Sequence, residues 1–284
     1  MKNHKDIFTG HESFSLREGW IVKGIDAINR RGKNIFNGNE LINTIDEMGI
    51  GANMVKSLKY WLEVYNIVDE ELEIKLIVSE ILKYDSYMQK DMTLWILHFL
   101  ALNEKRDRKN IVWNIISYKN ENMPFDKEQI VDLINLETVK NYSKKTIENS
   151  LTVYIKTYFY QEDKKRNDPE NNLISPFVKL NYLNKDKNNE NFYFRNIEYK
   201  EINKYLGYMI LKSFCKINNS IEKIEAYNKF KCIIKMDSYN FEMHLKEMEN
   251  ENLISIDRAA GLNNINLILI TDDLELIKKI YEGV

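Results

Sequence analysis

The strongest constraint on the fold is a spacing that recurs three times along the chain. In each occurrence a short turn separates two amphipathic helical patterns, and a short apolar segment follows the second pattern. Twelve residues separate the first inward-facing residue of the second helix from the first apolar residue of that segment, in the pairs Val55 and Ile67, Ile147 and Phe159, and Phe241 and Leu253. A helix of about eleven residues that leads directly into a strand gives this spacing. The sequence therefore predicts a mainly α protein with small β wings, built from tandem winged helix-turn-helix units.

Turn and cap residues mark the elements of these three units. Gly49-Ile50-Gly51 separates the two helices of the first unit, and Ser143 and Asp237 are the expected N-caps of the second helix in the other two. Alternating apolar residues predict the strand pairs, at residues 72–76 in the first unit, 177–183 with 192–197 in the second, and 253–256 with 265–267 in the third.

Two charged segments, residues 103–110 and 161–172, read as solvated connections between these elements. We therefore expect three domains. These are an N-terminal winged-helix unit over residues 1–105, a second winged-helix unit over 106–200, and a third winged-helix-like unit over 201–284.

The composition of the chain indicates the cellular compartment in which it works. The 284 residues are 44% hydrophobic, which is typical of a folded protein. Two widely spaced cysteines favour neither a disulfide framework nor a zinc module, and the polar start of the chain predicts no secretory signal. The apolar segment 93–102 is about half the length of a membrane span and contains His98, so it reads as a buried core helix. We expect a cytoplasmic protein without a membrane partner.

Nucleic-acid binding by this chain would depend on local patches, because 41 basic and 43 acidic residues give a net charge of -2. In a winged helix the second helix usually enters the major groove. The DNA-contacting candidates on that helix are polar residues of the first two units: Asn53, Lys56 and Lys59, and Ser143, Lys144, Lys145 and Asn149. The alternative is that these lysines are ordinary solvent-exposed residues on the outer face of each helix and bind nothing. In the third unit Glu242, Glu247 and Glu249 would repel phosphates, which favours a scaffold or a protein contact.

A dense polar run from Gly10 to Trp20 allows two interpretations. It can be a constrained loop leading into a helix, in which Ser15 and Glu18 form a capping box. It can also be a small reactive site, for which His11, Glu12 and Arg17 are the catalytic candidates. The structural interpretation is favoured, because so few groups do not define a site. Sequence motifs of P-loop nucleotide hydrolysis, zinc proteolysis and serine hydrolysis do not occur in the chain.

Three segments of the chain, FTGHESFSLREGW, GIGANMVKSLKYWL and DMTLWILHFL, resemble the bacterial domain-of-unknown-function family 4007. The resemblance implies an association with DNA phosphorothioation and phage-defence gene clusters, alongside cysteine desulfurases and sulfotransferase-like or reductase-like partners. It also implies a DNA-nicking role that has been attributed to relatives. Nicking needs a nucleophile or a metal-bound water, so a divalent metal such as Mg²⁺ is the candidate cofactor, with its ligands unassigned.

Two functions follow from the sequence. In the first, the chain is a DNA-binding component of a DNA sulfur-modification or phage-defence system, with nicking as an activity to test and the proteins encoded nearby as partners. In the second, the chain is a non-catalytic assembly or regulatory protein whose winged helices hold partner proteins.

Overall fold

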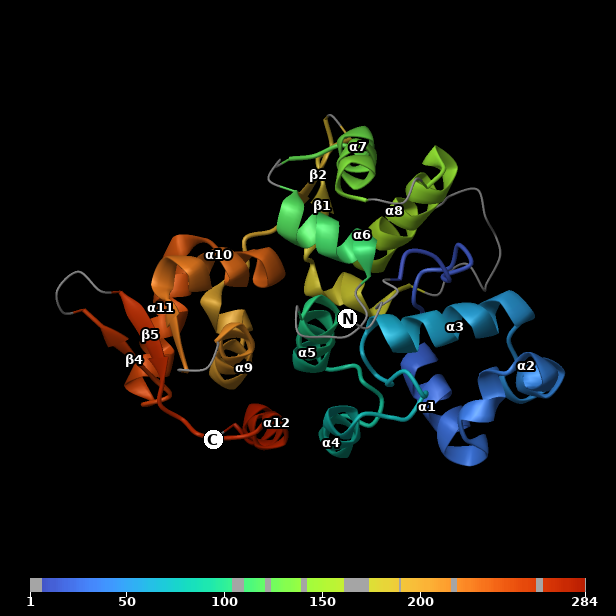
Figure 1. Ribbon diagram of the computed structural model, residues 1–284, viewed down its shortest axis with the longest axis horizontal. Helices are drawn as coiled ribbons and strands as arrows, with labels where there is room; N and C mark the ends of the chain where they lie inside the picture. The colour runs from blue at the N-terminus through green and yellow to red at the C-terminus, as the bar shows by residue number, and fades with distance from the viewer. Residues whose placement is uncertain are drawn as a thin grey trace. The chain divides into compact units, whose positions relative to one another are not determined.

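The computed structural model describes residues 7–103, 110–120, 124–138, 142–160, 174–188, 190–215, 219–258 and 263–283. The protein is mainly helical with small antiparallel sheets (Figure 1). It forms two compact units, one made of Met1–Leu102 and Arg106–Phe194 and the other of Asn103–Lys105 and Arg195–Val284. No helix in the described ranges is both long and apolar enough to cross a membrane.

The first unit begins with α1 (Trp20–Arg31) and α2 (Leu41–Met48), which both pack on α3 (Ala52–Val64). The prediction of a strand pair over residues 72–76 is wrong, because the described residues form only one bridge there. A single antiparallel bridge joins Val68 to Ile74, and Leu76 already begins α4 (Leu76–Tyr84). The apolar pattern after Leu76 has helical spacing, because Val78 and Ile81 are both buried on one side of α4.

Helix α5 (Asp91–Leu102) is the predicted core helix, and every residue from Thr93 to Leu102 is buried. His98 has a polar partner within this core, since its Nδ1 atom lies 2.8 Å from the Tyr158 hydroxyl. That hydroxyl also accepts a hydrogen bond from Trp113 Nε1 at 3.3 Å. The core of this unit is therefore rich in aromatic rings, with Trp61 fully buried beside Trp113.

The second half of the same unit contains α6 (Ile111–Asn114), which continues into a π-helical turn, followed by α7 (Lys127–Glu137) and α8 (Lys144–Tyr158). Strands β1 (Leu183–Lys185) and β2 (Phe192–Phe194) form an antiparallel pair, and Phe125 pairs with Phe192 just before α7. The prediction of strand over residues 177–180 is wrong. Ser175 caps a 3-10 helix, Pro176–Leu180, because proline favours a first helical position and supplies no N–H for a sheet.

The second unit contains α9 (Lys204–Phe214), α10 (Lys223–Ile234), α11 (Ser238–Asn250) and α12 (Asp273–Glu282). Its antiparallel sheet has the strand order β3-β5-β4, formed by β3 (Ser220–Glu222), β5 (Asn264–Leu267) and β4 (Ile254–Asp257). Asp237 caps α11 as predicted, because its side chain accepts a hydrogen bond from the Asn240 N–H. The core of this unit is closely packed where the fully buried His244 ring lies against Gly207 of α9.

Candidate nucleic-acid interface

Helix α3 carries the first set of predicted DNA contacts. Asn53 and Lys56 are exposed, and Lys59 is half-buried. The three positions are three residues apart in sequence, so they lie along one face of the helix. The opposite face carries Leu58 and Trp61, which are fully buried. The structure therefore leaves one polar stripe of α3 open to solvent.

The first turn of α8 carries the second set. Ser143 caps the helix as predicted, since its Oγ accepts a hydrogen bond from the Thr146 N–H at 3.2 Å. Lys144 and Lys145 are both exposed, and the Lys144 ammonium lies 3.8 Å from the Glu148 carboxylate. The start of a helix also carries partial positive charge. This turn is therefore suited to an anionic partner such as a phosphate.

A segment that we call the N-terminal strap, residues 7–19, lies against α8. Phe8 stacks on Tyr142, with ring centroids 3.7 Å apart. The Nδ2 atom of Asn149 donates to Ser13 Oγ at 2.9 Å. These contacts join residues more than a hundred positions apart, so no local pattern in the sequence predicts them. Only the polar density of the run marked the strap as unusual.

His11 of the strap is held by both of its ring nitrogens. The Ser13 N–H donates to Nδ1 at 3.1 Å, so Nε2 carries the hydrogen and donates to Ser150 Oγ at 3.0 Å. The side chain is only 3% exposed, and burial lowers the pKa of His11 to about 4. His11 is therefore neutral at pH 7, and these contacts give it a packing role between the strap and α8.

The other two catalytic candidates have different surroundings. Glu12 is exposed and has a φ angle of +48°, in a left-handed turn that Ser13 continues with φ +66°. Arg17 is buried, with its guanidinium carbon 5.4 Å from the centre of the Phe14 ring and 5.3 Å from that of Trp20. The structure therefore places Glu12 toward solvent and both His11 and Arg17 inside. A catalytic role for the three remains a prediction.

The predicted capping box of Ser15 and Glu18 is wrong. Helix α1 begins at Trp20, and its N-cap is Gly19 in the left-handed conformation, without a side-chain cap. The Glu18 carboxylate instead lies 3.4 Å from the Lys179 ammonium, and the Glu18 N–H donates to the Ile174 carbonyl at 3.2 Å. Long-range contacts therefore hold Glu18 in the strap and out of the helix.

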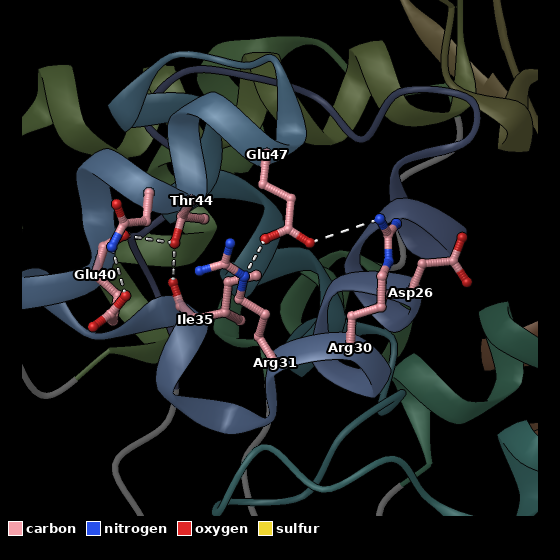
Figure 2. Close-up of polar contacts among 8 residues, drawn as sticks. Asp26, Arg30, Arg31, Ile35, Glu40, Thr44 and Glu47 are labelled. Carbon is pink, nitrogen blue, oxygen red and sulfur yellow. Dashed lines mark hydrogen bonds and ion pairs between the residues drawn. The ribbon is translucent and has the colours of Figure 1, made fainter.

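The basic residues at the end of α1, Arg30 and Arg31, pair with a carboxylate of α2 (Figure 2). Glu47 of α2 lies 2.6 Å from Arg31 Nε and 3.7 Å from Arg30 Nη1. Lys33 pairs with Glu71 at 3.0 Å. Figure 2 also shows Thr44, whose hydroxyl donates to the Ile35 carbonyl at 2.6 Å. The Glu47 contacts connect α1 to α2, and these ion pairs reduce the positive charge offered to a phosphate. A further basic run of the sequence, residues 105–109, lies outside the described residues.

Mg²⁺ is the candidate cofactor that the family resemblance implies. Within the described ranges, no group of three or more histidine, cysteine, aspartate or glutamate side chains is arranged to hold a metal ion. No catalytic step is therefore assigned to a metal.

Comparison with known proteins gives one family and two similar structures. The model of a family described as "Protein of unknown function (DUF4007)" matches residues 8–281. A structure described as "Magnesium ion-bound SspB crystal structure" matches with a TM-score of 0.79 and 15% identity, over 98% of this chain and 88% of that one. A second, "SspB crystal structure", matches with a TM-score of 0.78 and 16% identity over the same shares. A search of curated proteins found no match. At these identities the likeness shows a shared fold.

Proposed function

Because the chain belongs to the DUF4007 family over residues 8–281, we propose that it is the DNA-binding component of a DNA sulfur-modification or phage-defence system. The assignment to such a system is supported by the family resemblance, and other proteins of the system are the proposed partners. In this proposal the chain contacts DNA through tandem winged-helix units at residues 1–105 and 106–200. The first turn of α8 is the principal contact.

The order of elements supports winged-helix units. In the compact unit that contains Arg195–Val284, the elements follow in the order α9, β3, α10, α11, β4 and β5. The two outer strands of its sheet, β3 and β4, both pair with β5. The part of the other compact unit that follows α6 has a similar order. Phe125 stands in place of the first strand, and α7, α8 and the β1–β2 pair follow it. In this order the helix before the last two strands is the one that enters the major groove. That helix is α8 in one case and α11 in the other.

The observation that carries the proposal is the exposure of Lys144 and Lys145 on the capped first turn of α8. Lysines at such a position neutralise phosphates, and the free N–H groups of the turn add to the attraction. Lys56 on α3 would supply a further phosphate contact.

A second candidate function is favoured by α11. Tyr239 of this helix is exposed, and two of the helix's carboxylates pair with cations, Glu242 with Lys223 at 2.6 Å and Glu249 with Arg258 at 2.8 Å. A helix with this charge balance would not attract phosphates. We propose that the third segment, residues 201–284, contacts a partner protein, as the assembly function requires.

A salt titration of DNA binding tests the proposal. The affinity of the full chain for a fluorescent DNA duplex should fall steeply as salt rises, because each neutralised phosphate contributes about 0.9 to the slope of log K against log salt. The Lys145→Ala variant should weaken binding and lower the slope by about 0.9, whereas Lys278→Ala on α12 should leave both unchanged. An absence of binding at low salt would refute the DNA proposal and favour the assembly function.

DNA nicking is the activity to test beside binding. Supercoiled plasmid would be incubated with Mg²⁺ or Mn²⁺ and either the wild type, His11→Ala or Glu12→Ala. If Glu12 takes part in nicking, Glu12→Ala should lose the activity, whereas a loss in His11→Ala would also follow from a disturbed strap. Equal nicking by all three proteins would exclude both residues from the reaction.

A further inference from the structure

The contact between Ser13 and Asn149 joins the N-terminal strap to the exposed face of α8. The Asn149 amide donates from Nδ2 to Ser13 Oγ at 2.9 Å, across 136 positions of sequence, and both residues are exposed. Asn149 lies four residues after Lys145, one turn along the same helix face. An exposed side chain on this face would normally sample several rotamers, and this hydrogen bond selects one of them.

Ser13 is itself held in place. Its N–H donates to His11 Nδ1 at 3.1 Å, and the Phe14 N–H closes the turn on the His11 carbonyl at 2.8 Å. His11 in turn contacts Ser150, the residue after Asn149, so the turn is attached to α8 at two consecutive residues. Ser13 has φ +66°, which is strained for a residue with a Cβ atom. Such strain persists where surrounding contacts fix the backbone, and it is frequent at binding sites.

The geometry leaves Asn149 able to recognise one base. Its amide has two N–H hydrogens and one carbonyl oxygen, and Ser13 uses one hydrogen. In the described part of the chain, the second hydrogen and the Oδ1 atom have no other hydrogen-bond partner. One donor and one acceptor side by side match the N7 and N6 groups of adenine in the major groove, which is the usual pairing for asparagine.

We infer that Ser13 is a positioning residue that orients the Asn149 amide to bind an adenine edge, so that the strap sets the sequence specificity of α8. The inference rests on the proposed function, since it requires α8 to enter the major groove. It concerns specificity, whereas Lys144 and Lys145 would supply affinity that does not depend on sequence.

Selection from a pool of random-sequence DNA duplexes tests the inference. The wild type should enrich a motif containing adenine at a fixed position. Asn149→Ala and Ser13→Ala should both lower the preference for adenine at that same position by about tenfold, with a smaller effect on total affinity. The control Ser86→Ala changes an exposed serine in the turn after α4 and should enrich the wild-type motif.

A second variant separates positioning from folding. Glycine adopts φ +66° without strain, so Ser13→Gly should not lower the thermal stability, yet it lacks the hydroxyl and should lose the adenine preference. The inference is overturned if Ser13→Gly and Ser13→Ala enrich the wild-type motif, or if the wild type enriches none. If Lys145→Ala weakens DNA binding in the same experiments, the proposed function stands while the inference fails. If the wild type binds no DNA, both fail.

Discussion

Replacing His11 removes a buried titratable group, and the structure predicts the consequence for stability. The pKa of His11 falls from 6.5 to about 4 because burial disfavours the charged imidazolium. Below pH 6.5, His11 is therefore protonated in the unfolded chain, whereas in the folded chain it stays neutral until the pH falls to about 4. Stability from this site is complete above pH 6.5 and is lost as pH falls through that window. The loss amounts to about 3 kcal/mol.

Urea unfolding, followed by tryptophan fluorescence at a series of pH values, measures this effect. The fluorescence reports on the unit that contains His11, because all four tryptophans lie in it, at Trp20, Trp61, Trp95 and Trp113. In His11→Asn a carboxamide oxygen can still accept from the Ser13 N–H, and the variant does not titrate. Its free energy of unfolding should be lower at neutral pH and should change less between about pH 6.5 and 4.

Ser150→Ala is the matched control for this measurement. It removes the partner of the His11 Nε2 hydrogen and keeps the buried imidazole. This variant should lose stability, by about 1 to 3 kcal/mol, yet keep a pH dependence between pH 6.5 and 4. The reasoning is refuted if wild type and His11→Asn lose the same free energy over that window, because the titrating groups would then lie elsewhere.

Three further outcomes follow from the structure. Gly207→Ala would place a Cβ atom against the His244 ring, so we expect a loss of about 1 to 3 kcal/mol, measured by circular dichroism. Adding His244→Ala should recover part of this loss, and a purely additive double variant would contradict the clash. Trp61→Ala should cost about 3 to 5 kcal/mol in urea unfolding, because the ring is fully buried, and a change below about 1 kcal/mol would show that the site collapses around it. Glu12→Gln removes an exposed negative charge from the strap beside α8 and should strengthen DNA binding at low salt, whereas unchanged affinity would place Glu12 away from the DNA.

Local signals in the sequence were sufficient for the helix starts whose partners are three residues away. Ser143 and Asp237 cap α8 and α11 as predicted, since a cap needs only its own first turn. The Ser15 and Glu18 pattern is equally local, but Glu18 finds Lys179, which is 161 positions later, and the helix starts at Trp20 instead. A cap pattern therefore predicts a helix start only where no distant partner competes for its side chains.

The candidate interface likewise contains features that the sequence predicts and features that it does not. The exposure of Lys144 and Lys145 follows from the amphipathic pattern of α8, which the sequence contains. The contact of Ser13 with Asn149 does not, because it depends on how the strap folds back over a helix 136 positions away. The sequence therefore contains the pattern that predicts candidate phosphate contacts, but no pattern that predicts the residue proposed to orient a base contact.

The packing of the strap also decides which variants can test catalysis. His11 is buried and has a partner at each ring nitrogen, and Arg17 is buried near the Phe14 and Trp20 rings. Substituting either one disturbs the attachment of the strap, so lost nicking would not separate chemistry from folding. Glu12 is exposed, and its replacement by glutamine keeps the shape of the side chain. Of the three candidates, Glu12→Gln is therefore the variant whose nicking activity is informative. Loss of nicking without any loss of DNA affinity would assign Glu12 to the reaction, and unchanged nicking would exclude Glu12 from it.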